Sequence, residues 1–182
     1  TKISRRHFLA ATGVMTGSAL LSPLSGIKAE TIGISTPIVK KTRIALIGTG
    51  SRGIFMWGRD LVREYSNYIE FVGLCDINEG RVETGKRMIG VSCPTYTDFE
   101  KMMKETKPEV LIVTTMDSTH HQFIIRGMEL GANVITEKPM TIDEKKIQAI
   151  LDAEERTGKH CRVTFNYRYS PHRAKIWELL RA

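Results

Sequence analysis

An apolar run that leads directly into three glycines decides the fold of this sequence: residues 43–53 read RIALIGTGSRG. The apolar residues up to Ile47 are typical of a short buried β-strand. Residues 54–63, which follow the last glycine, have a helical pattern. The segment therefore predicts a strand, a glycine turn and a helix in immediate succession.

The three glycines have separate physical roles in such a turn. Gly48 permits a tight turn after the strand, Gly50 lets the backbone approach a phosphate closely, and Gly53 lets helix and strand pack together. The N-terminal end of the helix then faces the negative charge of a pyrophosphate. Ser51 and Arg52 complete this predicted dinucleotide-binding loop.

An acidic residue at the end of the next apolar run supports this interpretation. Asp76 follows the run 69–75 and lies 23 positions after Gly53, where a carboxylate accepts hydrogen bonds from an adenosine ribose. The same carboxylate repels a 2′-phosphate, so NAD is expected rather than NADP. Two alternatives stay open. Arg52 or Arg81 could neutralise a 2′-phosphate, and the motif could be a glycine turn beside an unrelated surface acid.

The rest of the chain alternates between short apolar runs and longer helical patterns. Strands are predicted at 43–47, 69–75, 110–114, 133–136 and 162–166, with a weaker strand at 94–96. Their continuous apolar character indicates a parallel sheet covered by helices on both faces, hence an α/β, doubly wound Rossmann domain. Helix ends are indicated by two capping-box pairs and by two glycines: Thr97 with Glu100, Thr141 with Glu144, Gly131 and Gly158.

Residues 137–139, Glu-Lys-Pro, directly follow the apolar run 134–136. This is the carboxyl end of a predicted strand, where open α/β sheets bind ligands. A lysine partly desolvated beside an oxidised nicotinamide gives up its proton more readily, so Lys138 is a candidate for proton transfer. The alternative is that Lys138 pairs with a nearby acid. The bond between Lys138 and Pro139 is a candidate cis peptide.

With the glycine loop, Asp76 and the segment TMDSTH at 115–120, the Glu-Lys-Pro motif resembles the Gfo/Idh/MocA oxidoreductases over residues 43–171. That family typically has a T-P-N-x-x-H segment and then E-K-P. Here Met116 and Asp117 replace the usual Pro and Asn, which affects the loop at the nicotinamide end.

The resemblance implies that a hydride is exchanged between NAD and a carbinol carbon of a sugar or polyol. Lys138 would then assist the proton and contact the substrate. Thr115, His120 and Glu137 would join the cofactor site, and Arg168 would line the substrate cleft. For the neighbouring His121, a capping or solvent-facing role is expected.

The N-terminal residues predict an export signal. Arg5 and Arg6 precede a weakly apolar stretch that ends near Leu24, and a cleavage site is expected after Ala29. The paired arginines indicate the twin-arginine route, hence the export machinery as a partner and a periplasmic or otherwise extracytoplasmic location. The stretch lacks the roughly 18 uninterrupted apolar residues of a membrane span.

The predicted organisation has four parts: a signal peptide at 1–29, a linker at 30–41, the NAD-binding domain at 42–165, and residues 166–182 as the start of a truncated α/β substrate domain. The last part begins with Ser170 and Pro171, which are typical of a helix start. Any homo-oligomer is expected to form through the missing portion of that domain.

Charge and cysteine content exclude other classes. Residues 1–41 hold six basic residues and one acidic residue, whereas the remainder holds 21 basic and 19 acidic residues. The body therefore has no basic excess for nucleic-acid binding. Cys75, Cys93 and Cys161 lack metal-ligand spacing and are expected to be buried thiols.

Three functions compete: an NAD-dependent oxidoreductase acting on a carbohydrate, a glycosidase or epimerase that oxidises its sugar transiently with tightly bound NAD, and a non-catalytic dinucleotide-binding module. Lys138 argues against the third. Predicted export favours the closed cycle, because free NAD is not expected outside the cytoplasm.

Overall fold

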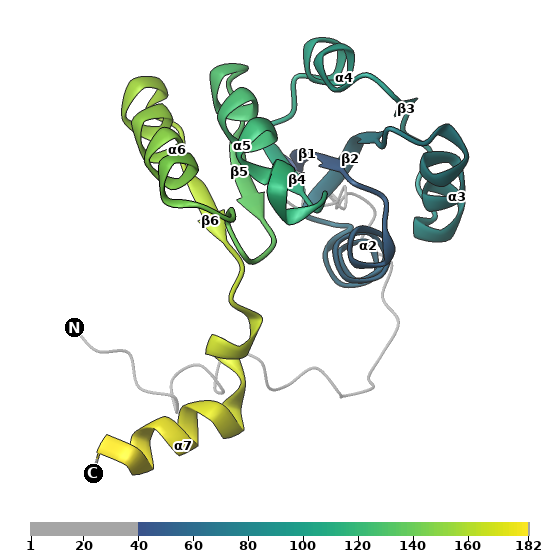
Figure 1. The fold of residues 1–182 in the computed structure, drawn as a ribbon. Helices are drawn as coiled ribbons and strands as arrows, with labels where there is room; N and C mark the ends of the chain where they lie inside the picture. Colours follow the sequence, from purple (N-terminus) through teal and green to yellow (C-terminus); the bar gives the residue numbers. More distant parts are fainter. Residues whose placement is uncertain (1–39, 182) are drawn as a thin grey trace, which may run out of the picture. The chain divides into compact units, whose positions relative to one another are not determined.

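A parallel β-sheet with helices on both faces organises the chain (Figure 1). The computed structural model describes residues 40–181. The predicted signal peptide and nearly all of the predicted linker lie outside the described residues. The strands are β1 (Thr42–Ile47), β2 (Ile69–Cys75), β3 (Thr95–Tyr96), β4 (Val110–Val113), β5 (Asn133–Thr136) and β6 (Cys161–Val163).

The six strands pair in the order β3-β2-β1-β4-β5-β6, and all five pairings are parallel. The strand order reverses between β1 and β4, which creates a crevice at the carboxyl ends of these two strands. This confirms the doubly wound Rossmann fold. The last strand ends at Val163 rather than at Asn166, because residues 166–169 form a short 3₁₀ turn.

The helical segments follow the strands in alternation. They are η1 (Arg52–Arg59), α2 (Asp60–Tyr65), α3 (Glu79–Ile89), α4 (Phe99–Thr106), η2 (Asp117–Thr119), α5 (His120–Glu129), α6 (Glu144–Thr157), η3 (Asn166–Tyr169) and α7 (Pro171–Arg181). The segment η1 has π-helical hydrogen bonding and continues into α2, so the single helix predicted at 54–63 has two parts. Each residue of α7 is exposed.

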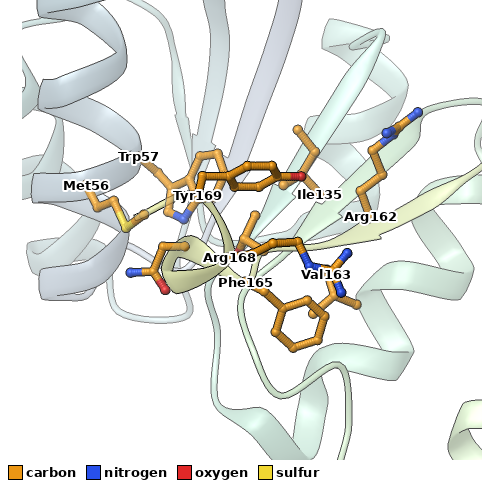
Figure 2. A pocket seen from close by; sticks show the side chains of 10 residues that line it. Met56, Trp57, Ile135, Arg162, Val163, Phe165, Arg168 and Tyr169 are labelled. Carbon is orange, nitrogen blue, oxygen red and sulfur yellow. The ribbon is translucent and has the colours of Figure 1, made fainter. Parts of the chain in front are cut away.

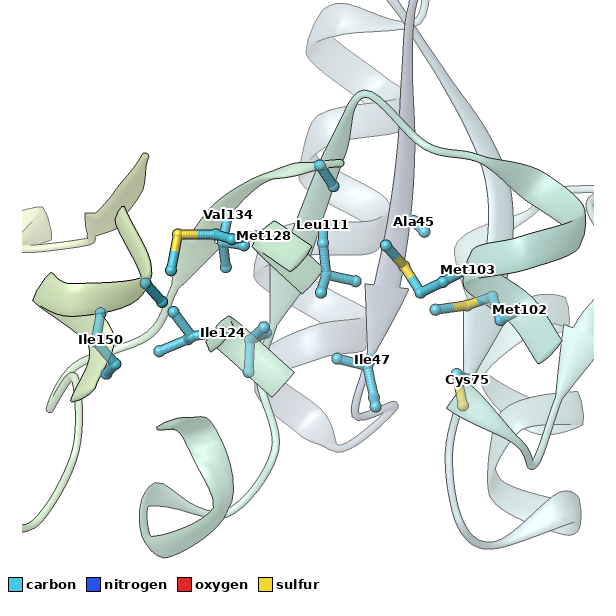
Figure 3. Packing of buried hydrophobic residues seen from close by; sticks show 13 residues of the cluster. Ala45, Ile47, Cys75, Met102, Met103, Leu111, Ile124, Met128, Val134 and Ile150 are labelled. Carbon is cyan, nitrogen blue, oxygen red and sulfur yellow. The ribbon is translucent and has the colours of Figure 1, made fainter. Parts of the chain in front are cut away.

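Two apolar layers fix the sheet between its helices. One joins the sheet to α4, α5 and α6 through residues such as Met102, Ile124 and Ile150 (Figure 3). The other joins it to η1 and α3 through residues such as Ile54 and Val82. Burying a side chain of this size contributes about 1.5–3 kcal/mol, so these layers hold the strand ends in place.

The N-terminal caps of α4 and α6 are other residues than the capping-box spacing predicted. Asp98 and Asp143 cap α4 and α6 by accepting hydrogen bonds from the backbone N–H groups of Lys101 and Lys146. The predicted Thr97 and Thr141 therefore do not cap these helices. Both helices begin later in the chain than the capping-box spacing predicts. Because an aspartate carboxylate caps as well as a threonine hydroxyl, the spacing alone selects the wrong residue.

The predicted glycine ends of helices are confirmed. Gly131 and Gly158 follow α5 and α6 with positive φ angles of 95° and 65°. The described residues contain no helix that is both long and apolar enough to cross a membrane.

Candidate functional site

The glycine loop lies at the reversal of strand order, and Gly48 makes its turn. The φ angle of Gly48 is 94°, and a Cβ atom there would lie 2.6 Å from the backbone carbonyl of Thr114. The N–H of Gly48 donates to the carbonyl of Cys75 at 2.8 Å. The hydroxyl of Thr114 donates to the carbonyl of Gly48 at 2.6 Å. The turn is therefore locked to both neighbouring strands.

Gly53 and Gly50, the other two glycines, differ in the space available for a Cβ atom. A Cβ atom at Gly53 would lie 2.2 Å from the carbonyl oxygen of Gly48, so only a glycine lets η1 approach the turn. A Cβ atom at Gly50 would meet nothing within 4 Å. The backbone at Gly50 is thus open on the side that a pyrophosphate needs. Ser51, at the start of η1, has no side-chain capping bond and is exposed. This geometry fits a dinucleotide.

Asp76 is only 5% exposed and organises the same loop. Its Oδ2 accepts hydrogen bonds from the Thr49 N–H at 2.8 Å and from the Thr49 hydroxyl at 3.0 Å. Its Oδ1 accepts from the Asn78 N–H at 3.0 Å and lies 3.7 Å from Nη1 of Arg81. A carboxylate offers about four acceptor positions, so capacity for one further donor remains.

A cavity of about 430 Å³ adjoins Asp76. It is lined by the loop glycines and by apolar side chains that include Ile77, Met116 and Phe123. Ile77 and Met116 are 92% and 74% exposed, which is unusual for residues of this kind. The cavity therefore combines a polar end at Asp76 with apolar walls, as a bound adenosine requires.

A second cavity, of about 480 Å³, lies at the ends of β4 and β5 and is called the reactive cleft from here on. Its lining residues are Arg52, Thr114, Thr115, Asp117, His120, Glu137, Lys138, Asn166 and Tyr167. The cavity thus brings together predicted site residues from three segments: the start of η1, the loop after β4 and the Glu-Lys-Pro motif. Lys138 is exposed and forms no ion pair with any residue between 40 and 181. No acidic side chain within that range therefore holds Lys138 in place.

Glu137 is buried beneath this cleft. Its Oε1 accepts hydrogen bonds from Nε of Arg52 and from Nε1 of Trp57, each at 2.9 Å. Trp57 was not predicted from the sequence. Residues five apart lie on different faces of an α-helix, but the π-helical bonding of η1 brings Arg52 and Trp57 to the same acceptor.

His120 connects the loops that follow β4 and β5. Its ring is 1% exposed, with Nδ1 2.9 Å from the carbonyl oxygen of Pro139 and Nε2 3.0 Å from that of Thr115. The bond between Lys138 and Pro139 is cis, which confirms that prediction. Both ring nitrogens of His120 thus contact the backbone. His120 therefore ties the loop after β4 to the loop after β5.

His121 has a different environment from the one expected. It is partly buried, and Nδ1 has no hydrogen-bond partner among the described residues. Burial, followed by the charge of Lys146, lowers the pKa of His121 below its usual value of 6.5. It therefore does not face solvent freely.

Arg168 lies outside the reactive cleft. It lines a groove of about 560 Å³ together with Met56, Trp57, Phe165 and Tyr169 (Figure 2). Its guanidinium carbon lies 5.8 Å from the ring centre of Phe165. The neighbouring Asn166 lines both this groove and the cleft, and Tyr167 lines the cleft. The 3₁₀ turn of η3 directs successive side chains to different sides, whereas the family resemblance placed Arg168 in the cleft.

The cysteines are free thiols without a role in either cavity. Burial raises the pKa of Cys75 and Cys161 to about 12 and that of Cys93 to about 11. Cys75 and Cys93 are fully buried and Cys161 is partly buried. Within residues 40–181, no group of three or more His, Cys, Asp or Glu side chains is placed to hold a metal ion.

Comparison with known proteins identifies related sequences. The family described as "Oxidoreductase family, NAD-binding Rossmann fold" (Gfo/Idh/MocA) matches residues 42–165. Glycosyl hydrolase family 109 protein 1 of Akkermansia muciniphila is 32% identical over 145 residues, which is 75% of this chain and 30% of that protein. Inositol 2-dehydrogenase/D-chiro-inositol 3-dehydrogenase of Lactiplantibacillus plantarum is 24% identical over 140 residues, covering 76% and 39%.

A solved structure with bound ligands is also similar. The WlbA dehydrogenase of Chromobacterium violaceum, in complex with NADH and UDP-GlcNAcA, superposes with a TM-score of 0.65 at 25% identity, over 71% of this chain and 36% of that one. The chain thus spans between 30% and 39% of the length of the two curated relatives described above.

Proposed function

Because this chain belongs to the Gfo/Idh/MocA family of oxidoreductases with an NAD-binding Rossmann fold, we propose that the protein oxidises a carbinol carbon of a sugar or polyol. NAD is the cofactor of this domain. When bound, the nicotinamide supplies the hydride acceptor. Oxidation removes a hydride from the carbinol carbon and a proton from its hydroxyl group, so a second group must take the proton.

Lys138 is the group proposed to take this proton. The observation that carries the proposal is that Lys138 stands exposed in the reactive cleft, next to the buried Glu137 and without an ionic partner among the described residues. A lysine already paired with an acid would have to break that pair before reaching a substrate. As the hydride leaves the carbon, Nζ of Lys138 in its neutral amine form accepts the hydroxyl proton, and the alcohol becomes a carbonyl.

The other residues of the site hold the two ends of the cofactor. Gly50 presents an open backbone to the pyrophosphate, and Asp76 accepts a hydrogen bond from the adenosine ribose. Thr115 and His120 shape the opposite end, where the two loops meet. Arg168 is placed in the neighbouring groove and is proposed to act on substrate only if it turns toward the cleft.

A glycosidase or epimerase cycle is the second candidate function. It is supported by the similarity to the glycosyl hydrolase family 109 protein. In such a cycle the sugar is oxidised, an elimination or inversion follows, and the hydride returns to the sugar. NAD would then stay bound through turnover, in agreement with the expected export of the protein.

Export by the twin-arginine route, and thus an extracytoplasmic location, is part of the proposal. It depends on Arg5 and Arg6 and on the apolar stretch after them. This route is associated with proteins that fold and take up a cofactor before export. Residues 166–182 are proposed to begin a substrate domain, through which the protein would also form any homo-oligomer.

The proposed role of Lys138 is tested with Lys138→Ala in the full-length protein. The variant should keep its NAD affinity and lose roughly a hundredfold or more in rate, the usual scale for a general acid or base. Lys145→Ala is the matched control, since Lys145 is an exposed lysine on α6 outside the cleft. Equal rates for Lys138→Ala and the control would refute the role of Lys138.

The two candidate functions are distinguished by the fate of the cofactor. In the closed cycle, purified protein carries nicotinamide without added NAD and turns over many sugars per bound cofactor. In the simple dehydrogenase, free NADH accumulates in proportion to oxidised substrate, and activity depends on added NAD.

A further inference from the structure

Two donors from one helical segment converge on a single buried oxygen. Arg52 and Trp57 both belong to η1, and both donate to Oε1 of Glu137 at 2.9 Å. The Glu137 side chain is 7% exposed, whereas that of Arg52 is 42% exposed. A buried carboxylate is costly unless it is paired and hydrogen-bonded, so this arrangement holds Glu137 in one place.

The acceptor adjoins the residue proposed to move the proton. Glu137 follows the last residue of β5 and precedes Lys138 in the chain. Its backbone N–H donates to the carbonyl of Val113 at 3.1 Å, and the carbonyl of Pro139 faces the ring of His120. The backbone on both sides of Lys138 is therefore fixed to β4 and to α5.

The side chain of Glu137 supplies the third attachment of this segment, to the helix that follows the glycine loop. The same contact occupies Nε of Arg52, while Arg52 itself lines the reactive cleft. One carboxylate thus joins the part of the domain that holds the pyrophosphate to the strand end that carries Lys138. The negative charge of Glu137 is matched by Arg52, so it is not left to bind Lys138.

We propose that Glu137 is a positioning residue that holds Lys138 in register with the bound dinucleotide, and that Arg52 and Trp57 are the two donors through which it acts. This inference rests on the proposed role of Lys138 in proton transfer. The indole of Trp57 fixes the direction of the carboxylate, and the guanidinium of Arg52 balances its charge. Misplacing a reacting group by about 1 Å costs on the order of 100-fold in rate.

The test is a double-mutant cycle in the full-length protein, with turnover and NAD affinity measured separately. The variants are Glu137→Gln, Lys138→Ala and the two combined. Trp57→Phe removes one donor and keeps the aromatic ring, so it provides a second test if Glu137→Gln folds poorly. Glu100→Gln is the matched control, because it breaks the ion pair with Arg126 on α4 and α5, away from the cleft.

Glu137→Gln should lower kcat by about 10- to 100-fold while NAD affinity is kept. Trp57→Phe should lower kcat in the same direction by a smaller factor, Glu137→Asp should restore part of the rate, and the control should match wild type. On the Lys138→Ala background, Glu137→Gln should cause no further loss, because residues that act as a unit are not additive.

Two results separate the possible failures. If Lys138→Ala retains full rate, the proposed function of Lys138 is wrong. If Lys138→Ala loses rate as expected but Glu137→Gln has wild-type kcat, or lowers the rate further in the combined variant, the positioning role of Glu137 is refuted. The emission of Trp57, taken as the difference between each protein and its Trp57→Phe counterpart, gives a reading independent of activity: it should change in Glu137→Gln and stay constant in Glu100→Gln.

Discussion

Two glycines of the loop, Gly50 and Gly53, allow effects on stability to be distinguished from effects on cofactor binding. Replacing either one by alanine adds a single methyl group. In Gly53→Ala the new Cβ atom would lie 2.2 Å from the carbonyl oxygen of Gly48, a contact with backbone that no side-chain rotation relieves. In Gly50→Ala the new atom would meet nothing within 4 Å, and Gly50 does not have a positive φ angle. The same chemical change therefore has opposite consequences at positions three residues apart.

We expect Gly53→Ala to lower the free energy of unfolding by about 1–3 kcal/mol, the usual cost of overpacking. We expect Gly50→Ala to leave it unchanged within about 0.5 kcal/mol, or to raise it by about 0.4–1 kcal/mol, because alanine restricts the unfolded chain. NAD binding should respond differently. The pyrophosphate is proposed to approach the backbone at residue 50, so the new methyl group in Gly50→Ala should weaken NAD binding at least about tenfold, or 1.4 kcal/mol.

Urea denaturation of both variants, followed by NAD titration of the folded proteins, measures these effects. A variant Gly50→Ala that is stable and binds NAD as wild type does would refute the placement of the pyrophosphate at this loop. A variant Gly53→Ala with wild-type stability would refute the close approach of η1 to the turn.

Three further predictions concern the cofactor, the N-terminal residues and pH. Asp76→Asn should reduce the preference for NAD over NADP, an effect on the order of 1–3 kcal/mol. Equal or tighter binding of NADP by the wild type would mean that attraction of the 2′-phosphate by Arg81 outweighs its repulsion by Asp76. Changing Arg5 and Arg6 together to Lys should leave the precursor unexported, and undiminished export by a Sec-dependent route would contradict this. The pKa of His121 is lower in the folded protein than its usual value of 6.5 in the unfolded chain. As the pH drops, the unfolded chain therefore binds the proton before the folded protein does, and the free energy of unfolding falls as the pH drops through 6.5. His121→Gln should lose less stability than wild type between about pH 8 and pH 5, as measured by denaturation at both values.

The sequence predicted the parts of the fold that depend on local pattern. The run 43–53 indicated the strand, the turn and the helix, and the apolar runs indicated a parallel sheet, because buried strands leave a continuous apolar signal. Gly158 marked a helix end because only glycine adopts a positive φ angle at little cost. The Glu-Lys-Pro motif marked the edge of the sheet where the reactive cleft lies.

Contacts between distant segments were not predictable from these patterns. The attachment of Trp57 to Glu137 spans 80 positions and depends on the π-helical geometry of η1, which α-helical periodicity does not signal. Arg168 was placed in the cleft by the family resemblance, but it lies in a 3₁₀ turn and lines the groove beside the cleft. Thr141 and Asp143 both carry an oxygen that can cap a helix, so the sequence alone does not decide between them. The backbone geometry makes Asp143 the cap of α6.

The most direct measurement of the central claim is a crystal structure of the full-length protein with NAD bound. The account predicts the pyrophosphate against Gly50 at the start of η1, the adenosine ribose hydrogen-bonded to Asp76, and the nicotinamide ring in the cleft beside Lys138. A nicotinamide ring outside that cleft, or a ribose that makes no contact with Asp76, would contradict it.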